Sequence, residues 1–165
     1  MANRLAERLA VPHIEMDALH WEPNWTEAPL ALFRQRVADK VAEQRWVADG
    51  NYGKVRDLVW SRADTVVWLD YELSVVLWQL WCRTMRRLFS QEALWSGNRE
   101  RWFVQFFTRD SIFWWAFTSF PRHRRDYPIL LKQPEYAHLE VIRFSDPESA
   151  AAWLQQINQA RQSQT

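Results

Sequence analysis

The feature that most constrains this chain is an almost uninterrupted apolar run at residues 65–69, Thr-Val-Val-Trp-Leu, which stops at Asp70. β-Branched and aromatic residues dominate it, and no charged residue interrupts it. Such a run is typical of a strand that is buried on both faces, as strands of parallel sheets are. Parallel strands need crossover connections, which are usually helices, so this run predicts an α/β fold.

A second short run of strand formers, residues 46–48, ends in Asp49 and Gly50. Two interpretations are open from these residues alone. Asp-Gly is a common turn, in which the glycine supplies a positive φ. The carboxyl end of a strand is also where open α/β sheets bind their ligands. Asp49 is therefore our first candidate for a residue that contacts a substrate.

The rest of the chain alternates between helical and strand patterns of hydrophobicity. These patterns predict further strands at 13–16 and 139–144, and helices at 1–10, 26–44, 55–63, 72–89 and 147–157. An aromatic-rich helix is expected at 101–120, ending at Pro121, with a basic run at 122–125 behind it. The alternation predicts a three-layer α/β domain with a parallel sheet and a site along the carboxyl edge of its strands.

Composition excludes several classes of protein. Lysine and arginine number 21 against 20 acidic residues, so no overall field favours nucleic acid or an anionic membrane. The single cysteine, Cys82, is expected on the apolar side of a helix and fits a reducing cytoplasm. No apolar run approaches the ~18 residues of a membrane span. We predict a cytoplasmic protein without membrane contact, in which 12 tryptophans interleave with arginines to form core and stacking surfaces.

Several segments together carry a resemblance to a known family. In chain order they are residues 4–9, 17–21 (Asp-Ala-Leu-His-Trp), 46–52 (Trp-Val-Ala-Asp-Gly-Asn-Tyr), 63–70, 83–87 and 94–100 (Leu-Trp-Ser-Gly-Asn-Arg-Glu). This sequence resembles the small bacterial adenylate-kinase-like P-loop proteins that are often described as DNA topology modulation proteins, over residues 5–154. The resemblance implies one P-loop-kinase-like domain across 1–165, with a parallel sheet and a lid-like helical insert at about 83–128.

The same resemblance implies a function and a set of site residues. The expected reaction is ATP-dependent phosphoryl transfer, with Mg²⁺, to a nucleotide or small-molecule acceptor. Asp17 and Asp49 would face the acceptor, and one of them would take its proton. The catalytic residues implied are Asp17, Arg83, Arg87 and Arg99; the substrate-binding residues are Asp49, Gly50, Asn51, Tyr52, His20 and Trp21; weaker candidates for phosphate binding are Arg122, Arg124 and Arg125.

One departure from the family pattern matters more than the match. Glycine occurs only at 50, 53 and 97, so the phosphate-binding motif G-x-x-x-x-G-K-[ST] is not in this sequence. The family's first strand and loop would add about fifteen residues before Met1. We expect that strand between the strands that end near Asp17 and Asp49. A reading frame started too late, or a natural loss that leaves a pseudo-enzyme, would explain the difference; either way, activity in this chain is expected to be impaired.

Each candidate residue also has a plainer interpretation. In the plainer interpretation, the arginines at 83, 86 and 87 form a helix face that is exposed to solvent. The basic run 122–125 then interacts with the dipole at the end of a helix. His20 is structural in that case. Asp17 and His20 have helical ligand spacing, but no third ligand is evident, so no metal site is predicted. The second function considered is a non-catalytic regulatory protein that binds nucleic acid or a protein partner through arginine and aromatic surfaces.

Overall fold

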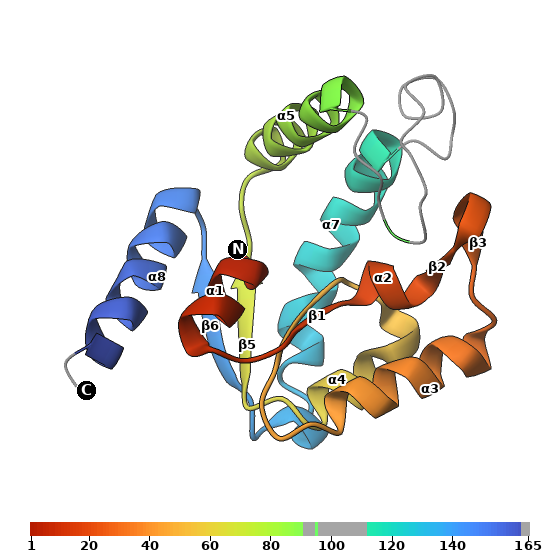
Figure 1. Cartoon of the computed structure of the whole chain (residues 1–165). Coiled ribbons are helices and arrows are strands. Elements are labelled where there is room, and N and C mark those ends of the chain that lie inside the picture. Colours follow the sequence, from red (N-terminus) through yellow and green to blue (C-terminus); the bar gives the residue numbers. More distant parts are fainter. Residues whose placement is uncertain (91–94, 96–111, 163–165) are drawn as a thin grey trace.

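The computed structural model describes residues 1–90, 95 and 112–162 (Figure 1). Its helices are α1 (Ala2–Leu9), α2 (Met16–His20), α3 (Leu30–Val41), α4 (Arg56–Trp60), α5 (Leu73–Ser90), α7 (Ile112–Leu130) and α8 (Pro147–Gln162). Its strands are β1 (His13–Glu15), β2 (Trp21–Glu22), β3 (Thr26–Glu27), β4 (Val47–Asp49), β5 (Thr65–Leu69) and β6 (Glu140–Phe144). Short 3₁₀ turns are η1 (Pro23–Trp25), η2 (Gly53–Val55) and η4 (Pro134–Tyr136).

The strands form two parallel pairs and one hairpin. β1 pairs with β4, and β5 pairs with β6, both in parallel, while β2 and β3 form an antiparallel hairpin. The expectation of an α/β fold with parallel strands is confirmed. Among the described residues, however, the two parallel pairs are not hydrogen-bonded to each other, so they do not form the single continuous sheet that was expected.

The expected position of an additional strand is wrong. β1 and β4 are direct neighbours, with Glu15 opposite Asp49, and the Val47 amide donates to the Pro12 carbonyl at 2.9 Å. No strand can therefore lie between them. A further strand could pair only outside the β1–β4 ladder. Backbone groups alternate in direction along a strand. Because the Asp70 amide bonds to Phe144 on β6, the backbone groups of Leu69 point away from β6.

Two of the differences from the predicted helices bear on the site. Residues 26 and 27 form β3 of the hairpin, so α3 begins only at Leu30. Pro121 does not end a helix: it and Pro128 both lie inside α7, and the basic run 122–125 sits within the helix. A proline removes one backbone hydrogen bond, but the buried Ala116 and Ser119 show that α7 also has packing to hold it. The predicted helix at 101–111 lies outside the described residues.

The main core lies between the β1–β4 pair and α3. Its buried side chains are Ile14, Met16, Ala28, Phe33, Val37, Val41 and Val55. On the other side, α1 buries Leu5 and Ala6, and the Arg8 guanidinium donates to a backbone carbonyl of α8. Cys82 is exposed, contrary to its expected apolar position. None of the helices in the described part of the chain has the length and hydropathy that a membrane crossing requires.

Candidate functional site

The carboxyl ends of β1 and β4 bring acidic side chains together. Glu15 and Asp49 are opposite each other in the ladder, and His13 lies between them. Its Nδ1 is 3.7 Å from Glu15 Oε1, and its Nε2 is 3.4 Å from Asp49 Oδ1. Burial raises the pKa of Asp49, and the neighbouring Glu15 and Asp17 raise it further. Asp49 thus lies at the end of a strand, beside other acidic residues that favour its protonated form. A carboxyl group in such a setting can exchange a proton with a ligand.

Asp17 is oriented by Tyr52. The Tyr52 hydroxyl donates a hydrogen bond to Asp17 Oδ1. Burial raises the pKa of Tyr52, and its bond to Asp17 raises it further, so the hydroxyl keeps its proton and remains the donor. The structure therefore brings together two of the residues predicted for the acceptor side.

Gly50 is required by the backbone. Its φ is +119°, and a Cβ placed on it would lie 2.6 Å from the Cβ of the buried Met16. Both the dihedral angle and the lack of space exclude a side chain. β4 ends at Asp49, and Gly50 supplies the positive φ that the turn interpretation of Asp-Gly expects.

His20 is buried in an aromatic cluster. Its side chain lies 4.9, 4.8 and 4.7 Å, centroid to centroid, from Trp21, Phe33 and Tyr52, and it is 4% exposed. Burial lowers its pKa. Nε2 is 3.8 Å from Glu27 Oε2, whereas Nδ1 has no hydrogen-bond partner among the described residues. This packing favours a structural role for His20, and Trp21 packs directly against its ring.

Asn51 is held by α7. Its Nδ2 donates toward the ring of His123, 3.1 Å from Nε2 and 3.2 Å from Nδ1, and its Oδ1 accepts from the Tyr127 hydroxyl. Burial lowers the pKa of His123, and Arg122 and Arg56 lower it further, so the ring is favoured in the neutral form that can accept. Asn51 was predicted to contact substrate, but its amide contacts the helix.

Asp70 forms a second contact with α7. Its side chain is only 3% exposed, accepts a 2.9 Å bond from Arg143 Nε and lies 3.5 Å from Arg124 Nε. The Arg143 guanidinium also stacks 4.8 Å from the Trp68 ring. In the sequence, Asp70 was noted only as the residue at which the apolar run stops, and Arg143 was missed. An acid directly after the clearest strand was the available signal for Asp70.

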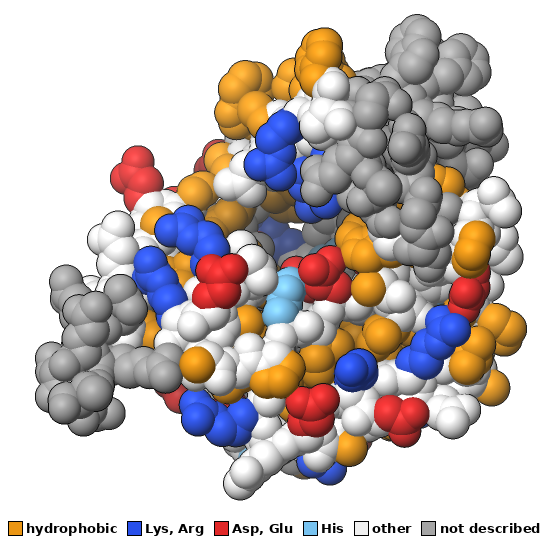
Figure 2. All heavy atoms as spheres, viewed as in Figure 1, with side chains coloured by type: hydrophobic (Ala, Val, Ile, Leu, Met, Phe, Trp, Pro, Cys, Tyr) orange, Lys and Arg blue, Asp and Glu red, His pale blue; other side chains and the backbone are white. Residues whose placement is uncertain are grey.

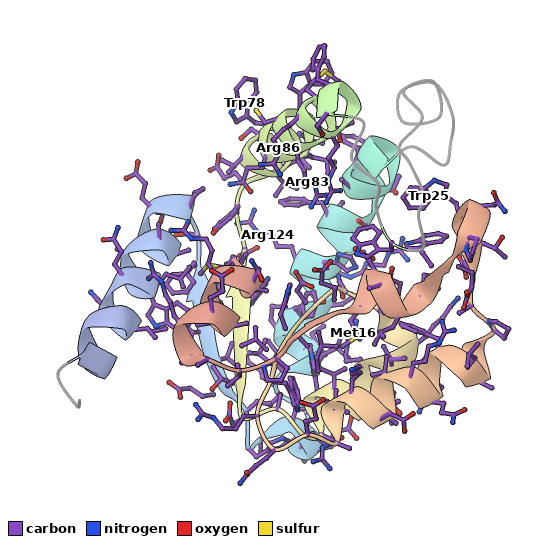
Figure 3. The ribbon with its side chains drawn as sticks, in the orientation of Figure 1. Met16, Trp25, Trp78, Arg83, Arg86 and Arg124 are labelled. Carbon is purple, nitrogen blue, oxygen red and sulfur yellow. The ribbon has the colours of Figure 1, made fainter. Side chains whose placement is uncertain are left out.

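These contacts place the basic run of α7 beside the ends of both strand pairs. His123 meets Asn51 beyond β4, and the next residue, Arg124, meets Asp70 beyond β5. Figure 3 shows Arg83 and Arg86 on the side of α5 that faces Arg124, with Trp78 on its far side. Figure 2 shows a hollow there, with basic side chains above it and acidic side chains and a histidine along its lower edge.

The predicted arginines are not equivalent. Arg87 is half-buried, with its guanidinium 5.8 Å from the Trp95 ring, and Arg83 is exposed on the same helix. Arg125 pairs with Asp126 at 2.8 Å on the surface. Arg122 is also exposed, and Arg99 lies outside the described residues. Arg124 lies 3.5 Å from Asp70, which directly follows β5.

No family model matches this sequence, and no curated protein or solved structure is significantly similar to it. The site must be interpreted from its own geometry. In the described residues, no group of three or more histidine, cysteine, aspartate or glutamate side chains is arranged to hold a metal ion.

Proposed function

We propose that this chain carries two facing parts of a phosphoryl-transfer site of the P-loop kinase type, one for a small-molecule acceptor and one for phosphate. The observation that carries the proposal is the double contact of α7, which meets Asn51 beyond β4 and Asp70 beyond β5. It supports a site in which guanidinium groups face carboxylates across the hollow. Phosphoryl transfer depends on such positioning and charge neutralisation more than on covalent chemistry by the protein.

In this proposal the side chains have separate tasks. Asp17, held by the Tyr52 hydroxyl, accepts the proton of the acceptor's hydroxyl group. Asp49 binds the acceptor beside it. Arg83, Arg87 and Arg124 hold the phosphate, for which guanidinium groups are well suited. Mg-ATP, when bound, supplies the phosphoryl group.

The fit to ATP is partial. The arginines suit phosphate oxygens, but the glycine-rich loop that would enclose them with backbone amides is not in these 165 residues. The open edges of β4 and β5 support the kinase-type architecture, since one more parallel strand between them would join both pairs into a five-stranded sheet. We propose that a P-loop strand takes this position, and that phosphate binding by the chain without it is weak.

Calorimetric titration of Mg-ATP into the chain tests the proposal. We expect weak but saturable binding, which Arg124→Ala and Arg87→Ala each reduce by about tenfold or more. Arg45→Ala, which removes an exposed arginine just before the amino end of β4, is the matched control and should bind as the unmodified chain does. Arg124→Lys, which keeps the charge, is a second variant if an alanine variant fails to fold. Absence of binding by the folded chain would contradict the proposal.

A specific observation also favours a second candidate function, non-catalytic binding of a partner. Helix α5 exposes Trp78, Trp81 and Phe89 at 66%, 44% and 86% of their surfaces. Exposed aromatics beside arginines suit stacking on nucleic acid bases. Anisotropy with labelled single-stranded DNA at rising salt tests this function, because phosphate contacts predict a steep loss of affinity with salt. Absent or salt-insensitive binding would argue against it.

A further inference from the structure

Opposite charges line the two sides of the hollow. The side formed by α5 and α7 contributes the arginines at 83, 86 and 124 (Figure 3). Glu15 and Asp49 are paired at the carboxyl ends of β1 and β4, and Asp17 follows in α2. Figure 2 shows acidic side chains along the lower edge of the hollow. A phosphate group is attracted to the first side and repelled by the second. An acceptor bound among the carboxylates is therefore unlike a nucleoside monophosphate, whose own phosphate would lie against three acids.

Tryptophan rings adjoin the acidic side. Trp21, Trp25 and Trp95 form an edge-to-face series, with centroids 5.6 Å and 6.5 Å apart. The Trp95 indole N–H donates to Glu15 Oε2 at 2.8 Å, which joins the aromatic series to the carboxylates. Indole faces beside carboxylates are the surroundings that attract an organic ammonium group.

One of these rings, that of Trp25, is carried by an unusual backbone conformation. Trp25 sits at the tip of the β2–β3 hairpin with φ of +57°, directly after Asn24 with φ of +63°. A bulky side chain in this region is uncommon, so the hairpin holds Trp25 in a conformation that the local sequence does not favour. The adjoining His20 is buried, and its Nδ1 has no hydrogen-bond partner among the described residues. A donor-bearing ligand or water would satisfy that nitrogen.

We propose that the acceptor side recognises an organic ammonium compound, such as an amino alcohol, with Glu15 and Asp49 opposing its charge and Trp25 contacting it through its ring face. The Trp95 ring already has the Arg87 guanidinium 5.8 Å from its centroid, so Trp95 contributes by holding Glu15 through its indole N–H. The inference rests on the proposed function in treating this surface as the acceptor side. The binding itself needs no nucleotide.

Choline and its neutral isostere 3,3-dimethyl-1-butanol separate charge recognition from shape. Both are titrated by calorimetry into the chain without ATP, together with adenosine monophosphate. We expect saturable binding of choline, with the isostere bound about tenfold more weakly because it lacks the cation. Equal affinity for choline and the isostere, no choline binding, or displacement of choline by adenosine monophosphate would overturn the inference.

Matched variants locate the site. Trp25→Ala and Glu15→Gln should each weaken choline binding by about fivefold or more. Trp78→Ala on the far side of α5 and Asp39→Asn on α3 are the controls, and neither should change it. Trp25→Phe keeps an aromatic face and should retain most of the affinity, which covers the case that the alanine variant does not fold. An equal loss in Trp78→Ala would contradict this location.

The outcome is distinguishable from that of the Mg-ATP titration. Choline binding without ATP binding would keep the ammonium site and contradict the kinase proposal. ATP binding without choline binding would keep the kinase proposal and contradict the ammonium site.

Discussion

At the scale of single residues, the turn after β4 is the position with the least freedom. Gly50 combines a φ of +119° with a lack of space for a side chain, because an added Cβ would lie 2.6 Å from the Cβ of the buried Met16. Asp49 and Asn51 flank it, and both take part in the candidate site. A change at Gly50 would therefore disturb the core and the site together.

We predict that Gly50→Ala lowers the free energy of unfolding by at least about 2 kcal/mol, from backbone strain and the contact with Met16. Gly53→Ala is the matched control, because the nearest atom to its added Cβ is 3.8 Å away. It should change stability by no more than about 0.5 kcal/mol. Urea denaturation measures both. Similar stabilities for the two variants would show that the strain at Gly50 is relieved by movement of the loop.

Asp49 gives a prediction about pH. Its pKa is raised in the folded protein, so its contribution to stability is fully present below the unfolded pKa and is lost as pH rises through the folded pKa. At neutral pH the ionised carboxylate therefore destabilises the fold. Asp49→Asn should stabilise the protein at pH 7, and the gain should shrink as pH falls toward 4.

The size of that gain is limited by solvent. The Asp49 side chain is 52% exposed, so we expect less than about 1 kcal/mol. Thermal denaturation of the variant and the unmodified chain across pH 4 to 8 measures it. Asp39→Asn on the surface of α3 should show no comparable pH-dependent gain. A variant less stable than the unmodified chain at pH 7 would mean that the contact with His13 outweighs burial.

At the scale of elements, α7 is the helix that connects the two halves of the site. It continues through Pro121, which is exposed, and through Pro128. Sequence patterns could predict most helices and strands, because apolar periodicity and strand formers are local properties. They could not predict that α7 continues, since the contacts of its far end, with Asn51 and Asp70, involve residues distant in the chain.

We predict that Pro121→Ala stabilises the chain by about 1–2 kcal/mol, because it restores a backbone donor within α7. The greater freedom of the unfolded chain without this proline offsets part of that gain. Pro134→Ala is the control. Pro134 lies at the start of η4, where its fixed φ is favourable, so its replacement should destabilise slightly. Thermal denaturation followed by circular dichroism measures both. A loss of helix signal in Pro121→Ala would show that the proline bend is needed for packing.

The candidate site was predictable to a similar extent. Asp17, Asp49 and Tyr52 follow strand patterns that are visible in the sequence, and the structure brings them together. The pairing of Asp70 with Arg143 joins residues 73 positions apart, and no local pattern encodes such a pairing. The order of the strands is equally non-local, which is why the position of an additional strand was predicted wrongly.

At the scale of the whole molecule, no other strand in the described part of the chain pairs with the outer edges of the two parallel pairs. Along β5 the backbone groups of Val66 and Trp68 point toward β6, while those of Val67 and Leu69 point away, because alternation follows from the bond between the Asp70 amide and Phe144. The outer edge of β5 is therefore a row of backbone groups directed away from β6.

We predict alternating protection of amide hydrogens along β5. Val66 and Trp68 should exchange slowly, and Val67 and Leu69 should exchange at least about tenfold faster, because their amides point away from the ladder. Nuclear magnetic resonance of the labelled chain in heavy water measures each rate. Equal protection of all four amides would mean that another strand, from this chain or a second copy, pairs with the outer edge.

One helical turn of α7 touches the ends of both parallel pairs, and this has a thermodynamic consequence. A ligand that draws Asn51 away from His123 would alter the helix that also holds Arg124 against Asp70. Occupancy of the acidic side would then change affinity on the basic side, and linkage requires the reverse effect to be equal in size. Two ligands that never touch each other would bind cooperatively, with α7 as the element that transmits their free energy of coupling.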